Sequence, residues 1–131
     1  MQLLLEQLSQ SLGDPALAAA RAAPETRVLF TPNGLQLRAL GDPALERSEV
    51  QAAGVAFIVR VCASQALMIA VDDVQRADEP SLALLASLAL QAHQLRLLIH
   101  VTVDADEREH RPPAFQVLVE HAAVEHLTAL D

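Results

Sequence analysis

The clearest feature in the pattern of hydrophobic and polar positions is an uninterrupted apolar run at 66–71, which ends at two carboxylates, Asp72 and Asp73. A run of this length suits a strand buried on both faces of a parallel sheet, although periodicity alone leaves a buried helix segment as an alternative. A second run, 95–103, is apolar at six of its nine positions and predicts another buried parallel strand. The pattern at 124–128 predicts a third, short strand.

Helical spacing dominates the first part of the chain. Leucines at 3, 4, 5, 8 and 12 form one stripe and predict a helix over 2–12. A short alanine-rich helix is expected over 16–23, ended by Pro24. The stretch 27–30 fits either a brief strand or a turn of helix.

A long helix is expected from Asp42 to about Ser64. Its apolar residues share one face, which predicts that this face packs in the core: Val50, Ala53, Phe57 and Val61. Gly54 within the helix costs about 1 kcal/mol relative to alanine. We therefore expect this glycine to allow close approach of a neighbouring element.

The segment after the first strand contains residues that favour the start of a helix. Asp78 is expected to be an N-cap, with Pro80 in the first turn, where a missing N–H costs little. The helix should continue to about His93. Its polar residues occupy one narrow sector and leucine or alanine fills the rest, as in a helix packed on a sheet: Ser87, Gln91 and Gln94.

The order of these elements predicts the fold class. A further helix should begin at Pro112–Pro113 and end near His121. Helices that alternate with strands predict a layered α/β domain. In that domain 67–72 and 96–103 should be parallel neighbours, joined by a right-handed crossover.

Composition narrows the classes of function. The 131 residues suit one domain with a helical part at 1–65 and strand–helix units at 66–131, and only 2% of them are aromatic. A net charge of −8 argues against a nucleic-acid surface. No apolar run reaches the roughly 18 residues of a membrane span. The single cysteine, Cys62, permits no internal disulfide, so we expect a cytoplasmic protein.

The stretch 72–82 reads Asp-Asp-Val-Gln-Arg-Ala-Asp-Glu-Pro-Ser-Leu. With the strand before it and the leucine-rich helix after it, this stretch resembles the Walker B segment of P-loop ATPases. More narrowly, it is similar to signal-transduction ATPases of the STAND and AAA type, including LuxR/MalT-like regulators. The resemblance is specific here and extends more weakly over 2–131. It implies an incomplete three-layer P-loop NTPase-like domain, with a short parallel sheet flanked by helices.

The resemblance also implies roles for individual residues. Asp72 would be the Mg²⁺ ligand, and Asp73 would be the catalytic acid that orients or deprotonates the attacking water. Thr102 would match the threonine of a Thr-x-Arg loop near the nucleotide. The plainer alternative is that two exposed aspartates end a strand and solubilise a loop.

Three departures from the family pattern argue against ATPase activity. The chain contains no lysine, so it cannot contain the lysine of the phosphate-binding loop. Arg76 stands where the family usually has tryptophan, and Asp104 stands where it has arginine. The resemblance implies Mg²⁺ and ATP in an intact domain of the family, whereas this chain alone is expected to bind them weakly or not at all.

Two hypotheses for function follow. In the first, the chain is a fragment of a longer ATP-dependent signalling protein, enzymatic only when whole. In the second, it is a non-catalytic module that binds a protein partner. The missing phosphate-loop strand would leave a gap in the sheet, so either 95–103 pairs directly with 124–128 or apolar edges stay open and invite self-association.

Other chemistry has little support in the sequence. The five histidines lack zinc-site spacing and there is no cysteine pair. The acidic run 104–109 has no central glycine for a calcium loop, so we expect a solvated turn.

Overall fold

A computed structural model describes residues 7, 18, 22, 24–29, 43–104 and 112–127. The described elements follow the order η1 (Pro24–Leu29), α3 (Pro43–Ser64), β1 (Leu67–Val71), η2 (Val74–Arg76), α4 (Glu79–Ala89), η3 (Ala92–Gln94), β2 (Leu97–Val101) and α5 (Pro113–Glu120). The predicted helices at 2–12 and 16–23 lie outside the described residues, apart from single helical positions at 7, 18 and 22.

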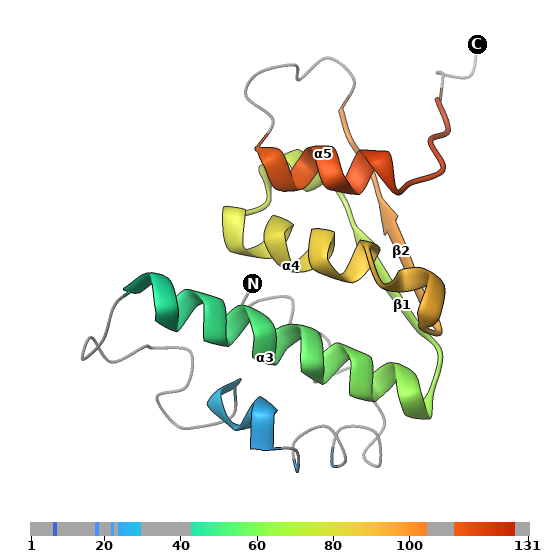
Figure 1. Ribbon diagram of the computed structural model, residues 1–131. Helices are drawn as coiled ribbons and strands as arrows, with labels where there is room; N and C mark the ends of the chain where they lie inside the picture. The colour runs from blue at the N-terminus through green and yellow to red at the C-terminus, as the bar shows by residue number, and fades with distance from the viewer. Residues whose placement is uncertain are drawn as a thin grey trace.

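The two strands pair in parallel, as predicted, to form a two-stranded sheet. The register runs from Leu67 opposite Leu97 to Val71 opposite Val101. The helix α4 lies between β1 and β2 in the sequence and connects them, so this part of the chain is an α/β unit (Figure 1). The hand of the crossover stays a prediction.

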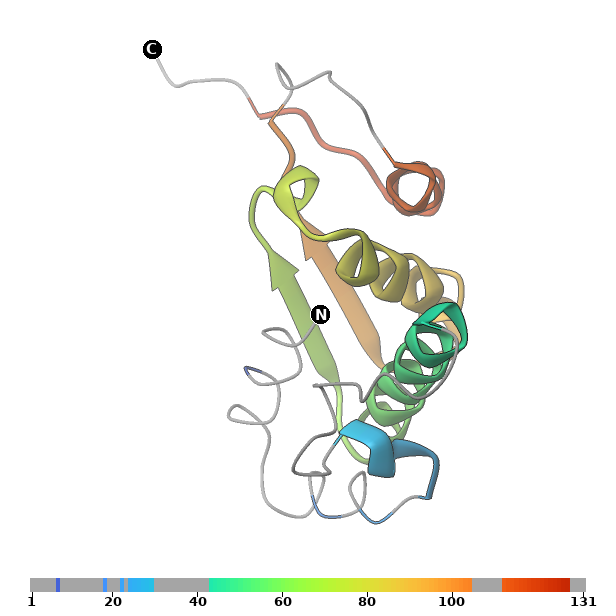
Figure 2. The same cartoon turned by 90° about the vertical axis from the view of Figure 1, so that its left-hand side faces the viewer.

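The predicted burial of both strands on two faces is wrong. In Figure 2 the helices α3, α4 and α5 all lie to one side of the strands. Side chains alternate between faces along a strand, so Ile69 is buried under the helices whereas Met68 is 57% and Leu98 is 59% exposed. No described helix covers the second face of the sheet.

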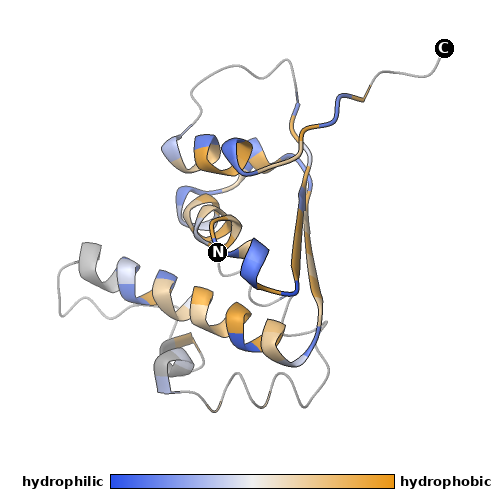
Figure 3. Cartoon of the chain, turned by 45° about the vertical axis from the view of Figure 1, so that its right-hand side comes forward, coloured by the Kyte–Doolittle hydropathy of each residue, from blue (hydrophilic) through white to orange (hydrophobic). Residues whose placement is uncertain are grey.

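The predicted third strand at 124–128 is also wrong over its described part. Residues 123–127 have no regular structure and are exposed, and they lead away from the helices and the sheet (Figures 1 and 3). Thr128 lies outside the described residues. Without an adjacent strand to take up its backbone hydrogen bonds, an extended segment has no ladder to join. Direct pairing with β2 is therefore not found, and among the described residues both outer edges of the sheet are unpaired.

The long helix α3 agrees with its prediction. It begins at Pro43 and ends at Ser64, and its predicted core face is buried: Val50, Ala53, Phe57 and Val61. A Cβ placed on Gly54 would lie 3.3 Å from Leu84 Cδ1, so this glycine does allow α4 to approach closely. Residues 27–29 of the ambiguous stretch at 27–30 belong to the 3₁₀ helix η1, which begins at Pro24, and Phe30 lies outside the described residues.

The helix α4 begins as predicted but ends early. The Asp78 carboxylate accepts a hydrogen bond of 2.7 Å from the Ser81 backbone N–H, which is the geometry of an N-cap. The helix ends at Ala89 rather than near His93. From Leu88 onward the backbone hydrogen bonds join residues that are three apart in the sequence, and the chain continues into the 3₁₀ helix η3.

The core is formed where α4 lies against the sheet and between α3 and α5. Its largest fully buried side chains come mainly from two helices: Phe57, Ile58, Val61, Leu82, Leu84, Leu85 and Leu88. Phe115 and Leu118 add the buried face of α5, which begins at Pro113 and ends at Glu120, close to the predicted bounds. Figure 3 shows apolar residues along both strands and around much of α3.

Candidate functional site

The carboxyl ends of β1 and β2 bring the three predicted site residues together. Asp72 and Asp73 follow β1, and Thr102 follows β2. The Thr102 hydroxyl donates a hydrogen bond to Asp72 Oδ1 and accepts one from the Asp73 backbone N–H at 2.9 Å. The Thr102 backbone N–H donates to the Val71 carbonyl at 3.0 Å, which extends the strand pairing by one residue. The parallel register therefore fixes this cluster.

Asp73 adopts a backbone conformation that is unusual for a residue with a side chain. Its φ of 49° and ψ of 51° lie in the left-handed region, and it is the one described non-glycine residue with positive φ. Such a conformation costs free energy and persists where neighbouring bonds hold it. Here the bond from its N–H to Thr102, and the 3.0 Å bond from Val74 N–H to the Thr102 carbonyl, anchor the turn.

Arg76 places a positive charge beside this turn. Its guanidinium lies 3.7 Å from Asp73 Oδ2, and the two side chains are 66% and 46% exposed. An exposed ion pair of this kind contributes little stability because water and salt screen it. Its consequence is local, since it partly neutralises the carboxylate to which the resemblance assigns water activation.

The site offers oxygen atoms of the kind that bind a hydrated cation. Carboxylate and hydroxyl oxygens are the hard donors that Mg²⁺ prefers, and Mg²⁺ usually keeps several of its waters. Within the described ranges, however, no group of three or more His, Cys, Asp or Glu residues converges on one point. Asp104 follows the same end of β2, is exposed, and adds negative charge where phosphates would have to approach. The sequence contains no lysine that could neutralise phosphate charge at this site.

Sequence reasoning missed one polar residue near the cluster. Gln75, in η2, has both polar atoms of its side chain buried and without a hydrogen-bond partner. A buried amide that forms no hydrogen bond is destabilising by about 1–3 kcal/mol. A glutamine within a turn gives no signal from which its burial could have been predicted.

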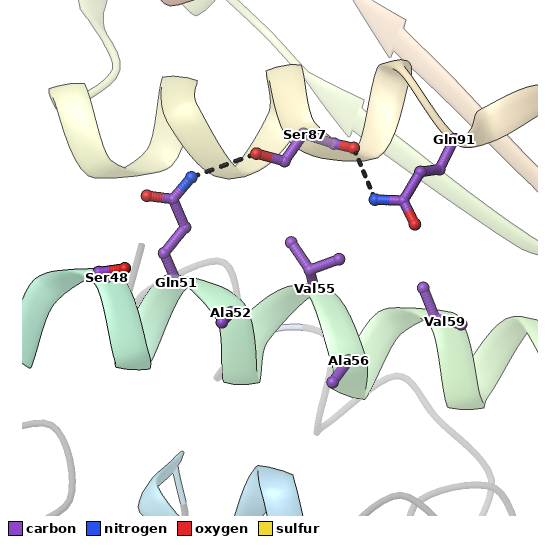
Figure 4. A pocket seen from close by; sticks show the side chains of 8 residues that line it. All are labelled: Ser48, Gln51, Ala52, Val55, Ala56, Val59, Ser87 and Gln91. Carbon is purple, nitrogen blue, oxygen red and sulfur yellow. Dashed lines mark hydrogen bonds between the residues drawn. The ribbon is translucent and has the colours of Figure 1, made fainter.

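A concave surface lies between α3 and α4 (Figure 4). It is an open groove of about 510 Å³, lined by Ser48, Gln51, Ala52, Val55, Ala56, Val59, Ser87 and Gln91. Gln51 Nε2 donates to Ser87 Oγ at 3.2 Å, and Gln91 Nε2 donates to the Ser87 carbonyl at 3.0 Å. The polar sector predicted on α4 therefore serves in part to bond α4 to α3, and these polar groups satisfy one another.

Cys62 is buried, as expected. Burial raises the pKa of the Cys62 thiol, and the nearby positive charge of Arg96 offsets this only in part. A raised pKa lowers the thiolate fraction and hence nucleophilicity. Among the described helices, none is long and apolar enough to cross a membrane.

Comparison with known proteins adds no assignment. No protein family, no curated protein and no solved structure matches this chain.

Proposed function

We propose that this chain is the Walker B portion of a STAND/AAA-type P-loop ATPase domain, as in LuxR-like regulators, and that it has no ATPase activity by itself. The observation that supports this most is the meeting of Asp72, Asp73 and Thr102 at the carboxyl ends of two parallel strands. Ligands of open parallel sheets bind at this edge.

In the intact domain, Asp72 would hold the Mg²⁺ ion and Asp73 would orient the attacking water. The Mg²⁺–nucleotide complex supplies the phosphoryl group and the charge neutralisation of its transfer. Thr102 positions both acids, because its hydroxyl bonds the Asp72 carboxylate and the Asp73 N–H. The phosphate-binding loop would come from another segment of a longer protein or from a partner chain.

Electrostatics explain why the chain should be inactive alone. ATP brings several negative charges to a chain of net charge −8. The site presents Asp72, Asp73 and nearby Asp104, and the Arg76 guanidinium lies 3.7 Å from Asp73 Oδ2. Two carboxylates alone leave Mg²⁺ mostly hydrated and loosely held.

A second candidate is a non-catalytic module that binds a protein partner. The uncovered sheet face with exposed Met68 and Leu98 supports it, because large apolar side chains gathered on one face are typical of interaction surfaces. The pairing of Arg76 with Asp73 supports it too, since it compromises the proposed catalytic acid.

Magnetic resonance titration with Mg²⁺, followed by calorimetric titration with Mg-ATP, tests the proposal. We expect Mg²⁺ to shift the amide signals of Asp72, Asp73 and Thr102 with millimolar affinity. Asp72→Asn should abolish these shifts, and the matched variant Asp104→Asn should keep them. A chain that shows no localised Mg²⁺ response would favour the interaction module.

Mg-ATP should produce neither measurable heat at micromolar concentrations nor hydrolysis. Binding at about 10 μM, near −7 kcal/mol, that is lost in Asp72→Asn would contradict the proposal. It would mean that the chain carries a phosphate site of its own.

A further inference from the structure

The outer edge of β2 is an unpaired strand edge. The bonds from Leu67 N–H to the Arg96 carbonyl and from Thr102 N–H to the Val71 carbonyl show that the even-numbered residues of β2 bond to β1. In a parallel pair the intervening residues direct their N–H and C=O groups the other way. The peptide groups of Leu97, Ile99 and Val101 therefore face outward, and no described strand takes them up.

The end of the described chain is an arm without regular structure, which we define as residues 123–127. Val124 is 60% and Leu127 is 92% exposed, and within the described ranges no backbone hydrogen bond joins the arm to another element. The arm leaves α5 and leads away from the layers (Figures 1 and 3). It is as long as β2, whose bounds are Leu97–Val101.

We propose that the arm of one copy adds as an antiparallel strand to the outer edge of β2 in a second copy, and that the exchange is reciprocal. An unpaired edge is a template for another strand, and exchange of identical elements is a common route to dimers. This use of the arm is independent of any nucleotide chemistry.

One register matches the added strand to the exposed face of β2. Opposing Leu127 to Leu98 places Glu125 opposite His100, on the face where both β2 side chains are exposed. The leucine pair covers apolar surface, and an N–H of the His100 imidazole can donate a hydrogen bond to the Glu125 carboxylate. On the other face Val124 lies opposite Val101. An antiparallel strand at the edge of a parallel sheet is common.

The outer edge of β1 fits the arm less well. Its side chains on the same face are Met68 and Ala70. Neither side chain can donate a hydrogen bond to the Glu125 carboxylate, so the β2 edge is the favoured site.

The contact is small, so the dimer should be weak. Each copy contributes five arm residues and one strand edge, well below the interface of roughly 800 Å² per partner that stable complexes bury. We expect a monomer at low micromolar concentration and a dimer at several hundred micromolar, measured by light scattering after size exclusion.

Mixing two variants that each carry one added cysteine tests the partner and the register. Leu98→Cys and Leu127→Cys are purified separately, mixed at high concentration and oxidised; native Cys62 is buried and stays unreactive. The mixture should form a covalent dimer at least fivefold more than either variant alone. A mixture of Leu90→Cys with Leu127→Cys is the matched control, because Leu90 is 50% exposed on another surface.

Proline variants test the hydrogen bonding. In this register the Val124 N–H points to β2 and the Glu125 N–H points away, so Val124→Pro should give a monomer and Glu125→Pro should still dimerise. Equal effects of the two prolines would overturn the proposal. So would a monomer at every concentration, or a Leu98→Cys/Leu127→Cys double variant that forms its disulfide within one chain at high dilution.

Discussion

Replacement of Thr102 by valine removes the hydroxyl that joins the two strand ends and leaves the shape of the side chain almost unchanged. Two hydrogen bonds are lost, one to the Asp72 carboxylate and one from the Asp73 N–H. Hydrogen bonds to charged groups contribute about 1.5–3 kcal/mol and neutral ones about 0.5–1.5 kcal/mol. Asp72 is exposed and water competes for it, so the lower ends apply. Thr102→Val should lower the free energy of unfolding by about 2 kcal/mol.

Urea denaturation followed by circular dichroism measures this loss. Thr102→Ser is the matched control, because it keeps the hydroxyl and loses one methyl group of a half-buried side chain. We expect it to lose less than about 1 kcal/mol. Equal losses in the two variants would show that the hydroxyl is not the stabilising group. A loss below about 0.5 kcal/mol in the valine variant would refute the reasoning from hydrogen bonds.

Two further predictions concern the helix contacts. Gly54→Val should lower the free energy of unfolding by about 1–3 kcal/mol, because its branched side chain cannot fit where a Cβ already meets Leu84 at 3.3 Å. Gly54→Ala should change the free energy of unfolding little, because a helix-propensity gain of about 1 kcal/mol offsets the close contact. Urea denaturation compares the alanine and valine variants. A valine variant as stable as the parent would contradict the close approach. Asp78→Ala should cost about 1 kcal/mol through loss of the bond from the Ser81 N–H, and Asp78→Asn should retain most of it. Similar losses in the alanine and asparagine variants would show that the cap is not responsible.

Local sequence features were sufficient to predict the elements with the clearest residue patterns. The cap at Asp78, the core face of α3 around Phe57 and the close approach at Gly54 were all predictable, because each depends on residues near in sequence or on helical spacing. The parallel pairing of the two strands was predictable from their alternation with a helix.

Burial on the second face of the sheet was not predictable. An apolar run indicates that a strand can be buried on both faces. It does not indicate whether another layer of the protein is present to cover Met68 and Leu98. The strand expected at 124–128 failed for a related reason, because strand formation needs a neighbouring edge that propensity does not supply.

The meeting of these candidate site residues was predictable from the sequence, but their backbone conformation was not. The order of Asp72, Asp73 and Thr102 after two parallel strands placed them at one edge. The left-handed backbone of Asp73 and the unpaired amide of Gln75 depend on how the turn packs, and their residue types gave no indication of it.

Arg96 links two regions that are far apart in sequence. Its side chain lies just before β2, and it donates to the Cys62 carbonyl at 3.2 Å and the Ala63 carbonyl at 2.7 Å in the last turn of α3. The end of α3 therefore cannot fray without releasing a side chain held at the start of the sheet. The helix end and the strand start should open together as one cooperative unit, and their amide protons should exchange with solvent at a common rate.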